Sequence, residues 1–477
     1  MAKFNKDSNM VGVTTNLAGG TSYSLDKRQE LVFSCLTSFL EDKYYESGDT
    51  RRERIAELVK ANDPIFVAKL AILARRSFHL RSMPVVLIGE LSRIHRGDSL
   101  VRRLIKASVE RVDDLTELIA YLGKPLPNQV KKGVSDALIK FSSYQLAKYK
   151  AEGKAVSLVD VFNLCHPDPS SVSSEQRDAW GSLINGTLKS TDTWEARLSS
   201  GEDKKTVWTD LIVNDKIGYM ALLRNLRNII SVCDDDVIAI ACDIISDPDR
   251  VHTSKQLPFR YYSAYEALAD SPRRDVMDAI SRAMDLSLDN IPPMDGSTLV
   301  AVDCSGSMMG DTIEKAAVFG AGLVRKHNAD LILYDTKIIP IHCFSSDAAL
   351  TTANRIVKYA TGGGTQTSLV FKHATDTGKK YDRIIILSDN ESWVETSFTH
   401  ASSRIKAAYE QYKREVNDCT VYAIDMAGYG TVDIIGSRVY NIAGWSEHVF
   451  DFIWWAERRD NLCGMIDNVE IPGITDV

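Results

Sequence analysis

The sequence predicts a multi-domain protein of the α plus α/β class, with a helical domain over 1–290 and an α/β domain over 297–477. Apolar residues recur at spacings of three and four through most of the first part, whereas the second part alternates short apolar runs with helical patterns. A segment containing Pro292, Pro293 and Gly296 separates the two parts. A chain of 477 residues also exceeds what one ordinary core accommodates.

The first part is predicted to consist of successive helices. They are expected over Leu25–Tyr45, Asp63–Phe78, Ser82–His95, Leu100–Arg111, Pro127–Lys150, Ile217–Val232 and Val237–Ile245. Asp63 followed by Pro64 is typical of a helix start, because aspartate caps the free amide groups and proline suits the first helical position. Helices of about 12 to 20 residues joined by short loops favour pairs stacked as a solenoid.

The second part is predicted to alternate strands with helices. Buried parallel strands are expected over 299–302 and 383–387, where apolar runs stop at polar residues, and a further strand over Cys419–Met426. The pattern also predicts a strand pair over Ala329–Cys343 and helices over Glu314–His327, Phe398–Asn417 and Val449–Trp455. The aromatic residues of the last helix are expected to pack in the core.

Polar residues follow two of these strands. The candidate metal ligands are Asp303, Ser305 and Ser307 after the first strand, Thr365 after a triple glycine, and Asp389 after the second strand. The carboxyl ends of parallel strands meet at one edge of a sheet, and glycines allow the tight turn that brings the threonine there. Mg²⁺ prefers about six oxygen ligands near 2.1 Å, so these residues predict a magnesium site with one open position.

A simpler interpretation is that Asp303 and Ser305 only cap the following helix. The agreement of three separate segments favours the cation site. With these residues in place, the region from 297 to 477 resembles the von Willebrand A (vWA) domain, whose metal-ion-dependent adhesion site has this five-residue pattern. No nucleophile paired with a base accompanies it, since Cys304 should point away from the metal and no histidine is near in sequence. The site is therefore expected to bind rather than to catalyse, and the protein is expected not to be an enzyme.

Composition restricts the class of protein further. The eight cysteines are scattered, with no Cys-x-x-Cys pair and no His-Cys cluster at metal spacing, which indicates a reducing compartment without structural zinc. Residues 1–9 are polar and no stretch of 18 apolar residues occurs, so no signal peptide or membrane span is expected. These observations predict a soluble, cytoplasmic protein with no membrane partner, which argues against extracellular adhesion.

The net charge of −7 conceals an uneven distribution. Residues 49–150 hold 20 Lys plus Arg against 11 Asp plus Glu, whereas residues 297–477 hold 17 against 23. Basic helical faces are usually only solvated, but here the cations cluster, and on a curved solenoid they would attract phosphates. The candidate RNA-binding cations of these clusters are Arg75, Arg76, Arg81, Lys131, Lys132, Lys148, Lys150, Arg224 and Arg227. Arginine suits bidentate phosphate contacts.

The two parts together resemble the Ro ribonucleoprotein family, of the bacterial or phage type. The resemblance covers almost the whole chain and rests on the vWA motifs DCSGSM and LSDNES with NLAGGTSY (Asn16–Tyr23), KYK (Lys148–Lys150), NLCH (Asn163–His166) and ALLRNLRN (Ala221–Asn228). It implies a monomeric ring of HEAT-type repeats, the TROVE module, closed by the vWA domain. Lys148 and His166 match the family's contacts to Y RNA, although Glu152 stands where the family often has another basic residue. Arg224 and Arg227 could serve ring packing instead.

The resemblance also implies a function without catalysis. Structured Y-like RNAs would bind the outer surface, and single-stranded 3′ ends of misfolded noncoding RNAs would enter the central hole, in RNA quality control or decay. An exoribonuclease partner would perform the degradation. Two alternatives remain: a metal-dependent protein-interaction scaffold without RNA, whose binding should depend only weakly on salt, and a metal-dependent nuclease, for which the site has too few carboxylates.

Overall fold

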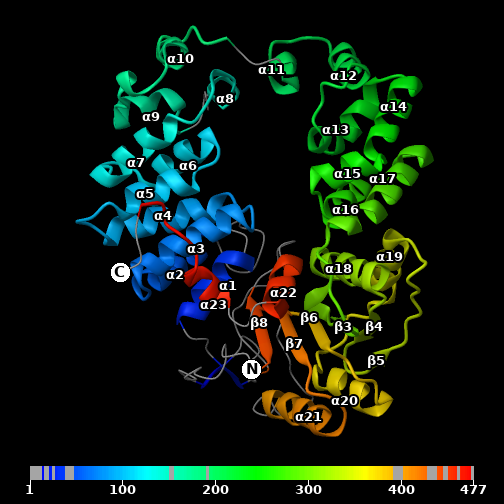
Figure 1. Cartoon of the computed structure of the whole chain (residues 1–477). Coiled ribbons are helices and arrows are strands. Elements are labelled where there is room, and N and C mark those ends of the chain that lie inside the picture. The colour runs from blue at the N-terminus through cyan, green and yellow to red at the C-terminus, as the bar shows by residue number, and fades with distance from the viewer. Residues whose placement is uncertain are drawn as a thin grey trace. The chain divides into compact units, whose positions relative to one another are not determined.

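A computed structural model gives the fold of the chain (Figure 1). It describes residues 13–15, 21–23, 27–37, 48–149, 155–189, 193–389, 401–426, 434, 438–443, 449–458 and 462–473. Two compact units form. We call residues 27–36, 40–197 and 461–477 the first unit, and residues 1–26, 37–39 and 198–460 the second unit. Helices of the N-terminal half are therefore divided between the two units.

The first unit is helical. Its helices are α1 (Lys27–Thr37), α2 (Gly48–Lys60), α3 (Pro64–Arg76), α4 (Ser82–Ile94), α5 (Leu100–Ser108), α6 (Val112–Leu122), α7 (Asn128–Leu138), α8 (Ser143–Lys148), α9 (Leu158–Cys165), α10 (Ser174–Ile184) and α23 (Leu462–Asp467), and α11 (Trp194–Ser199) spans its boundary with the second unit. Helices α3, α5, α7 and α9 pack in succession, while α2, α4 and α6 form a second row beside them (Figure 1). This is the stacked-pair arrangement that the helical spacing predicts.

Local sequence signals explain where these helices start. The predicted cap at Asp63 is confirmed, because its carboxylate accepts hydrogen bonds from the amides of Ile65 and Phe66 at 2.9 and 3.0 Å. The single helix predicted over Pro127–Lys150 is wrong. The chain breaks into α7 and α8 because Ser142 and Gln145 form a capping box that starts a new helix.

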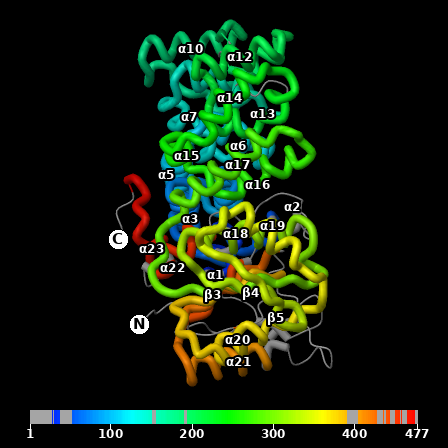
Figure 2. Tube along the Cα trace, turned by 90° about the vertical axis from the view of Figure 1, so that its right-hand side faces the viewer, coloured from blue at the N-terminus to red at the C-terminus, as the bar shows by residue number. Residues whose placement is uncertain are grey.

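The second unit begins with a further helical stack. It contains α12 (Lys204–Val213), α13 (Tyr219–Val232), α14 (Asp235–Ile245), α15 (Pro248–Ser254), α16 (Pro258–Glu266) and α17 (Arg274–Ser287). Figure 2 shows these helices descending to the α/β domain, where α16 packs on α18 (Asp311–His327) and α17 on α19 (Ala349–Tyr359). At this junction the Ala349 amide donates to Asp285 Oδ1 at 2.8 Å. The helical stack and the α/β domain thus form one compact unit.

The α/β domain is built on a six-stranded sheet in the order β5-β4-β3-β6-β7-β8. The strands are β3 (Thr298–Asp303), β4 (Asp330–Tyr334), β5 (Ile338–Ile339), β6 (Arg383–Ser388), β7 (Thr420–Asp425) and β8 (Val439–Ala443). All neighbours are parallel except β5, which runs antiparallel to β4. Every residue of β3, β6 and β7 is buried, as expected for central strands of a doubly covered parallel sheet.

Helices cover both faces of this sheet (Figure 1). Helices α20 (Ser368–Thr377) and α21 (Ala401–Glu415) lie on one face, where Ala301, Ile386 and Tyr409 belong to one apolar cluster. Helices α18, α19 and α22 (Val449–Arg458) lie on the other face. Phe450 of α22 stacks on Phe319 of α18 with ring centroids 4.4 Å apart, which confirms the core-packing role predicted for this aromatic segment.

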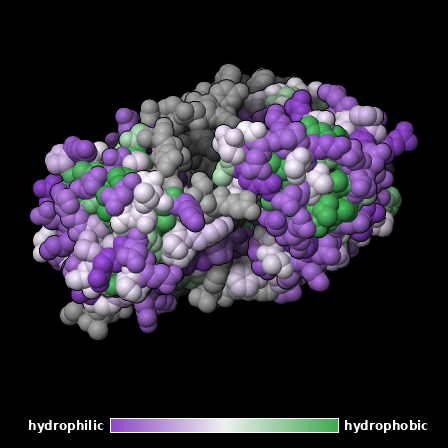
Figure 3. All heavy atoms as spheres, turned by 90° about the horizontal axis from the view of Figure 1, so that it is seen from above, coloured by the Kyte–Doolittle hydropathy of each residue, from purple (hydrophilic) through white to green (hydrophobic). Residues whose placement is uncertain are grey.

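Two shorter features complete the fold. Strands β1 (Val13–Thr15) and β2 (Thr21–Tyr23) form a separate antiparallel pair, in which β2 is the end of the NLAGGTSY segment, and Asn16–Gly20 lie outside the described residues. The face drawn in Figure 3 is mostly hydrophilic, with small hydrophobic patches. Within the described ranges, no helix has the length and apolar character needed to cross a membrane.

Candidate metal centre and nucleic-acid interface

The predicted metal ligands gather at one edge of the sheet. Strands β3 and β6 are parallel neighbours, so Asp303 at the end of β3 and Asp389 just after β6 emerge at the same edge. Asp303, Ser305, Thr365 and Asp389 are each at most 2% exposed, whereas Ser307 is exposed. The site therefore has a buried base and one open side. Asn390 and Glu391 of the LSDNES motif lie outside the described residues.

Hydrogen bonds fix the first three ligands. The Ser305 amide donates to Asp303 Oδ1 at 2.9 Å, and the Ser388 hydroxyl donates to Asp303 Oδ2 at 2.6 Å. The hydroxyl oxygens of Ser305 and Ser307 lie 3.2 Å apart. Cys304 is buried with its thiol near the Val302 carbonyl oxygen, so it contributes no open nucleophile.

The glycine-rich loop before Thr365 lies against Ser305. The Gly362 amide donates to the Cys304 carbonyl and the Gly306 amide to the Gly363 carbonyl, both at 2.9 Å, and Ser305 forms a parallel bridge with Gly363. Gly362 adopts φ +73°, a conformation that favours glycine. The turn thus brings the Thr365 segment alongside the ligands that follow β3.

Electrostatics at this edge favour a bound cation. The pKa of Asp303 is raised to about 7, chiefly by burial and also by the nearby Asp389 carboxylate, while the hydrogen bonds from Ser388 and Ser305 oppose the rise. A divalent cation would relieve the repulsion between these two buried carboxylates. Carboxylate and hydroxyl oxygens are the donor set that Mg²⁺ prefers. In the described ranges, this edge included, no three His, Cys, Asp or Glu residues are grouped so that they could hold a metal, so a cation here would depend on the hydroxyl oxygens as well as on the two carboxylates.

Gly363→Ala tests the packing of this loop. An added Cβ would lie 2.4 Å from Asp335 Oδ2, and that carboxylate cannot move freely because it accepts from the Thr361 hydroxyl at 2.6 Å and from the Lys337 amide at 2.9 Å. We expect a loss of about 1–3 kcal/mol of unfolding free energy, measured by thermal denaturation. Gly181→Ala is the control. Its Cβ would meet nothing within 4 Å inside α10, so it should stabilise by roughly 0.5–1 kcal/mol. Equal stabilities of the two variants would contradict this account.

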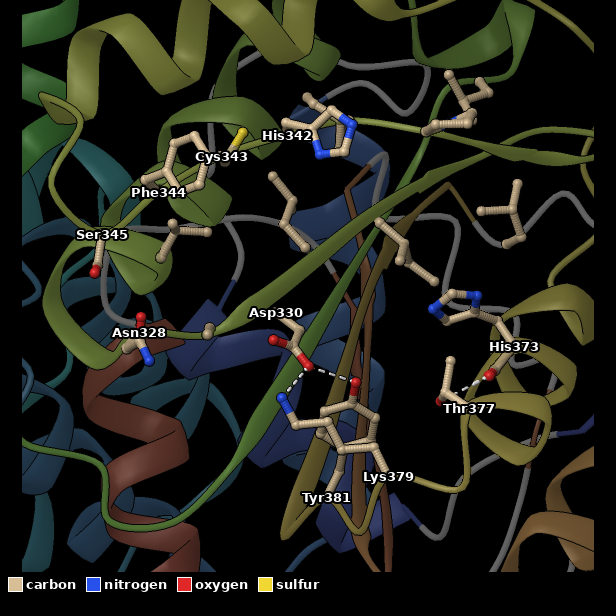
Figure 4. Close-up of a pocket in the computed structure, with 18 of the residues that line it drawn as sticks. Asn328, Asp330, His342, Cys343, Phe344, Ser345, His373, Thr377, Lys379 and Tyr381 are labelled. Carbon is tan, nitrogen blue, oxygen red and sulfur yellow. Dashed lines mark hydrogen bonds and ion pairs between the residues drawn. The ribbon is translucent and has the colours of Figure 1, made fainter.

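A cavity of about 690 Å³ lies in the same domain but is separate from the metal centre (Figure 4). It opens at the start of β4, where Asp330 accepts hydrogen bonds from Lys379 Nζ and the Tyr381 hydroxyl, each at 2.6 Å. Asp330 pairs with Leu299 near the beginning of β3, whereas Asp303 ends that strand. The cavity is therefore displaced along the strands from the candidate ligands.

The predicted RNA-binding arginines of the first unit divide into buried and exposed residues. The prediction of Arg75 as an RNA contact is wrong. The residue is only 4% exposed, and its guanidinium donates to Asp114 Oδ2 at 2.7 Å and to the Leu80 carbonyl at 3.1 Å. That side chain holds helices together and does not face solvent. Arg81 is 44% exposed but pairs with Asp113 at 2.7 Å. Arg76 is exposed and donates to the Ala107 carbonyl at the end of α5.

Other predicted cations are more accessible. Lys132, Lys148, Arg224 and Arg227 are exposed, and among the described residues no carboxylate forms an ion pair with any of them. Arg224 and Arg227 lie on α13 in the second unit, whereas the two lysines belong to the first unit. Lys150 lies outside the described residues.

His166 stands at an unusual backbone position. It ends α9 in the left-handed region, with φ 49°, and is exposed. Ser135 of α7 donates to the Cys165 carbonyl at 3.0 Å. Burial raises the pKa of the Cys165 thiol to about 11, and the nearby Lys131 ammonium opposes that rise. Lys131 therefore lies near the end of α9 that carries His166. No hydrogen bond or ion pair between described residues joins Lys148 to His166.

The aromatic residues around Lys148 were not among the residues predicted from the sequence to bind RNA. Tyr144 is 56% exposed, and its ring centroid lies 5.9 Å from Lys148 Nζ. The signal was present as a tyrosine four residues before the lysine, a spacing that places both on one helical face.

Comparisons with known proteins match both parts of the chain. Residues 180–285 match the family model described as the TROVE domain, and residues 297–454 match the one described as the Ro60 vWA domain. The crystal structure of the Deinococcus radiodurans RO (RSR) protein is similar in fold, with a TM-score of 0.64 at 16% identity over 88% of this chain and 97% of that one. The chain is thus a protein that joins a TROVE domain to a vWA domain.

Two related proteins are also similar to the chain in sequence. The chain is 22% identical over 375 residues to RNA-binding protein RO60 of Caenorhabditis elegans, covering 74% of this chain and 54% of that protein. It is 23% identical over 330 residues to telomerase protein component 1 of Rattus norvegicus, covering 50% of this chain and 12% of that protein. It therefore spans about half of the former relative and a small part of the latter. The chain belongs to the Ro family, and the predicted helical region followed by a vWA domain is confirmed.

Proposed function

We propose that the chain is a noncatalytic RNA-binding protein. The observation that carries this proposal is a set of exposed cations that form no ion pair with any described residue: Lys132, Lys148, Arg224 and Arg227. Other cations of the helical part, such as Arg75, Arg81 and Arg102, are bound to aspartates, so their charge is already compensated. The relative named RNA-binding protein RO60 supports the same function. Uncompensated surface cations attract the RNA backbone without reading its sequence.

The resemblance to the Ro family supports a more specific proposal about which RNAs bind and where. Structured Y-like RNAs bind at the exposed side chains of Lys148 and His166, and single-stranded 3′ ends of misfolded RNAs bind in a central hole, in cytoplasmic RNA quality control. An exoribonuclease partner degrades them. The chain acts as a monomer. The exposure of the Lys148 and His166 side chains supports their proposed contact with RNA.

A gel-shift titration tests this function. Purified protein is mixed at low and high salt with a Y-like stem-loop, a duplex with a single-stranded 3′ tail and a blunt duplex. Tight binding that weakens steeply with salt, with the tailed duplex preferred over the blunt one, is expected. Failure to bind any of these RNAs would favour the alternative, a metal-dependent protein-interaction scaffold. Cleavage of the RNA in the presence of Mg²⁺ would contradict the noncatalytic proposal.

Lys148→Ala combined with His166→Ala should weaken binding of the Y-like stem-loop by roughly tenfold, because both side chains are exposed and reach solvent from fixed helix ends. Binding of an isolated single-stranded tail should be retained. The control is Lys60→Ala, which removes an exposed charge from the end of α2 in the same unit. If the double variant lost stem and tail equally, the assignment of separate surfaces would be wrong.

We also propose that the vWA domain binds Mg²⁺ through Asp303, Ser305, Ser307, Thr365 and Asp389. The two buried carboxylates with adjacent hydroxyls support this ligand set. When bound, the cation supplies an open coordination position for an acidic group of a partner. The chain's own residues orient the ligands: Ser388 and the Ser305 amide hold the Asp303 carboxylate, and the Gly362–Gly363 turn positions the Thr365 segment.

A further inference from the structure

Aromatic and cationic side chains alternate on the surface around α8. Lys148 Nζ lies 5.9 Å from the ring centroid of Tyr144 and 5.6 Å from that of Tyr149. The Arg111 guanidinium carbon lies 4.6 Å from the centroid of the Tyr149 ring as well. We call Tyr144, Lys148, Tyr149 and Arg111 the aromatic–cation surface. Such interleaving is how proteins combine base stacking with attraction of the backbone of an unpaired strand.

Helix α8 holds this surface rigidly. Ser142 and Gln145 form the capping box that starts the helix, and Leu146 is fully buried beneath it. The Gln176 side-chain amide, from α10, donates to the carbonyls of Ile139 and Phe141 at 2.7 and 3.0 Å. The turn before α8 is thereby tied to a neighbouring helix. A platform fixed in advance loses little further conformational freedom when a ligand binds.

Arg111 and Tyr144, two members of the aromatic–cation surface, have different roles. Arg111 donates to both carboxylate oxygens of Asp113 at 2.9 Å, and its guanidinium also lies over the Tyr149 ring. The Arg111 side chain therefore has a packing role. Tyr144, in contrast, is 56% exposed and open to a ligand. Lys148 sits near the limit of about 6 Å for an attraction between a cation and a ring, so its ammonium is held weakly and can turn to a phosphate.

We propose that Tyr144 stacks on an unpaired base of the bound RNA while Lys148 contacts a phosphate beside that base. The ligand class is therefore a structured RNA with a bulged or looped-out nucleotide, in preference to an uninterrupted duplex. In a continuous duplex every base is stacked on its neighbours, so the Tyr144 ring would find no free base face. This inference rests on the proposed RNA binding and adds a specificity to it.

The test compares Tyr144→Ala with Tyr144→Phe in the full chain. The probes are a stem carrying one bulged 2-aminopurine, whose fluorescence falls on stacking, and a fully paired duplex of equal length. Tyr144→Ala should bind the bulged stem roughly tenfold more weakly than the unsubstituted protein, since stacking on one aromatic ring contributes about that factor, and should change duplex binding less than twofold. Tyr144→Phe keeps the ring and should behave like the unsubstituted protein. The 2-aminopurine fluorescence of the bulged stem should be quenched by the unsubstituted protein and by Tyr144→Phe, but not by Tyr144→Ala.

Tyr359→Ala is the matched control, because Tyr359 is a tyrosine of similar exposure at 48% on α19. Melting temperatures of all variants verify that they fold. If Tyr144→Ala binds the bulged stem as tightly as the unsubstituted protein, or loses both probes equally, the stacking role is overturned while RNA binding stands. If the unsubstituted protein binds neither probe at low salt, the proposed function fails as well. The two failures are thus distinguishable.

Discussion

Arg75→Ala is expected to lower the free energy of unfolding by about 3–5 kcal/mol, as measured by denaturant titration, because it leaves a buried carboxylate without its cation. The Arg75 and Asp114 side chains are 5% and 3% exposed, and their charged atoms lie 2.7 Å apart. Burial already raises the pKa of Asp114 despite the opposing charge of Arg75. Without the arginine, Asp114 must protonate or attract water, and both cost folding free energy.

Arg81→Ala is the control for this prediction. It removes the same charge from the neighbouring loop, but Arg81 is 44% exposed, so its ion pair with Asp113 should contribute less than about 1 kcal/mol. A double variant, Arg75→Met with Asp114→Leu, should recover most of the stability, since two apolar side chains can replace a buried ion pair. If Arg75→Ala instead left stability unchanged and weakened RNA binding alone, Arg75 would be an RNA contact after all.

The contrast between these arginines shows what the sequence could not reveal. Arg75, Arg76 and Arg81 form one basic cluster in the sequence, and clustering alone predicts a phosphate-binding surface. In the fold, Asp113 and Asp114 at the start of α6 lie against α3 and the loop after it, and they compensate two of the three charges. Partners more than 30 residues apart in sequence decide whether a cation is available, and no local pattern records them.

The gathering of the candidate metal ligands at one sheet edge was predictable for the opposite reason, because it depends on local patterns. Asp303 follows an apolar run directly and Asp389 follows another after Ser388, and such runs form adjacent buried strands whose ends meet at one edge. The site thus depends on the strand pattern, which is local. The break between α7 and α8 was missed because the apolar spacing continues across it, and only the Ser142–Gln145 capping box marks the new start. Tyr144 was missed with it, since its exposure depends on where α8 begins.

Asp303→Asn is expected to abolish divalent-cation binding by the full chain. In the unsubstituted protein, Mg²⁺ at one hundred times its dissociation constant should add about 2.7 kcal/mol to the free energy of unfolding and raise the melting temperature accordingly. The variant should show no Mg²⁺-dependent rise, because it lacks one of the two carboxylates that neutralise the cation. It should still fold without metal, since the asparagine oxygen can accept from the Ser305 amide while its amide group donates to the Ser388 hydroxyl.

The control for this variant is Asp376→Asn, which neutralises an exposed carboxylate on α20 of the same domain and should keep the full Mg²⁺ response. RNA binding by Asp303→Asn should match that of the unsubstituted protein, because the proposed RNA contacts lie on the helices. An undiminished Mg²⁺ response in Asp303→Asn would place the cation elsewhere. Loss of RNA binding in the folded variant would show that the vWA domain takes part in RNA binding directly, so the helical and vWA parts would no longer have separate roles.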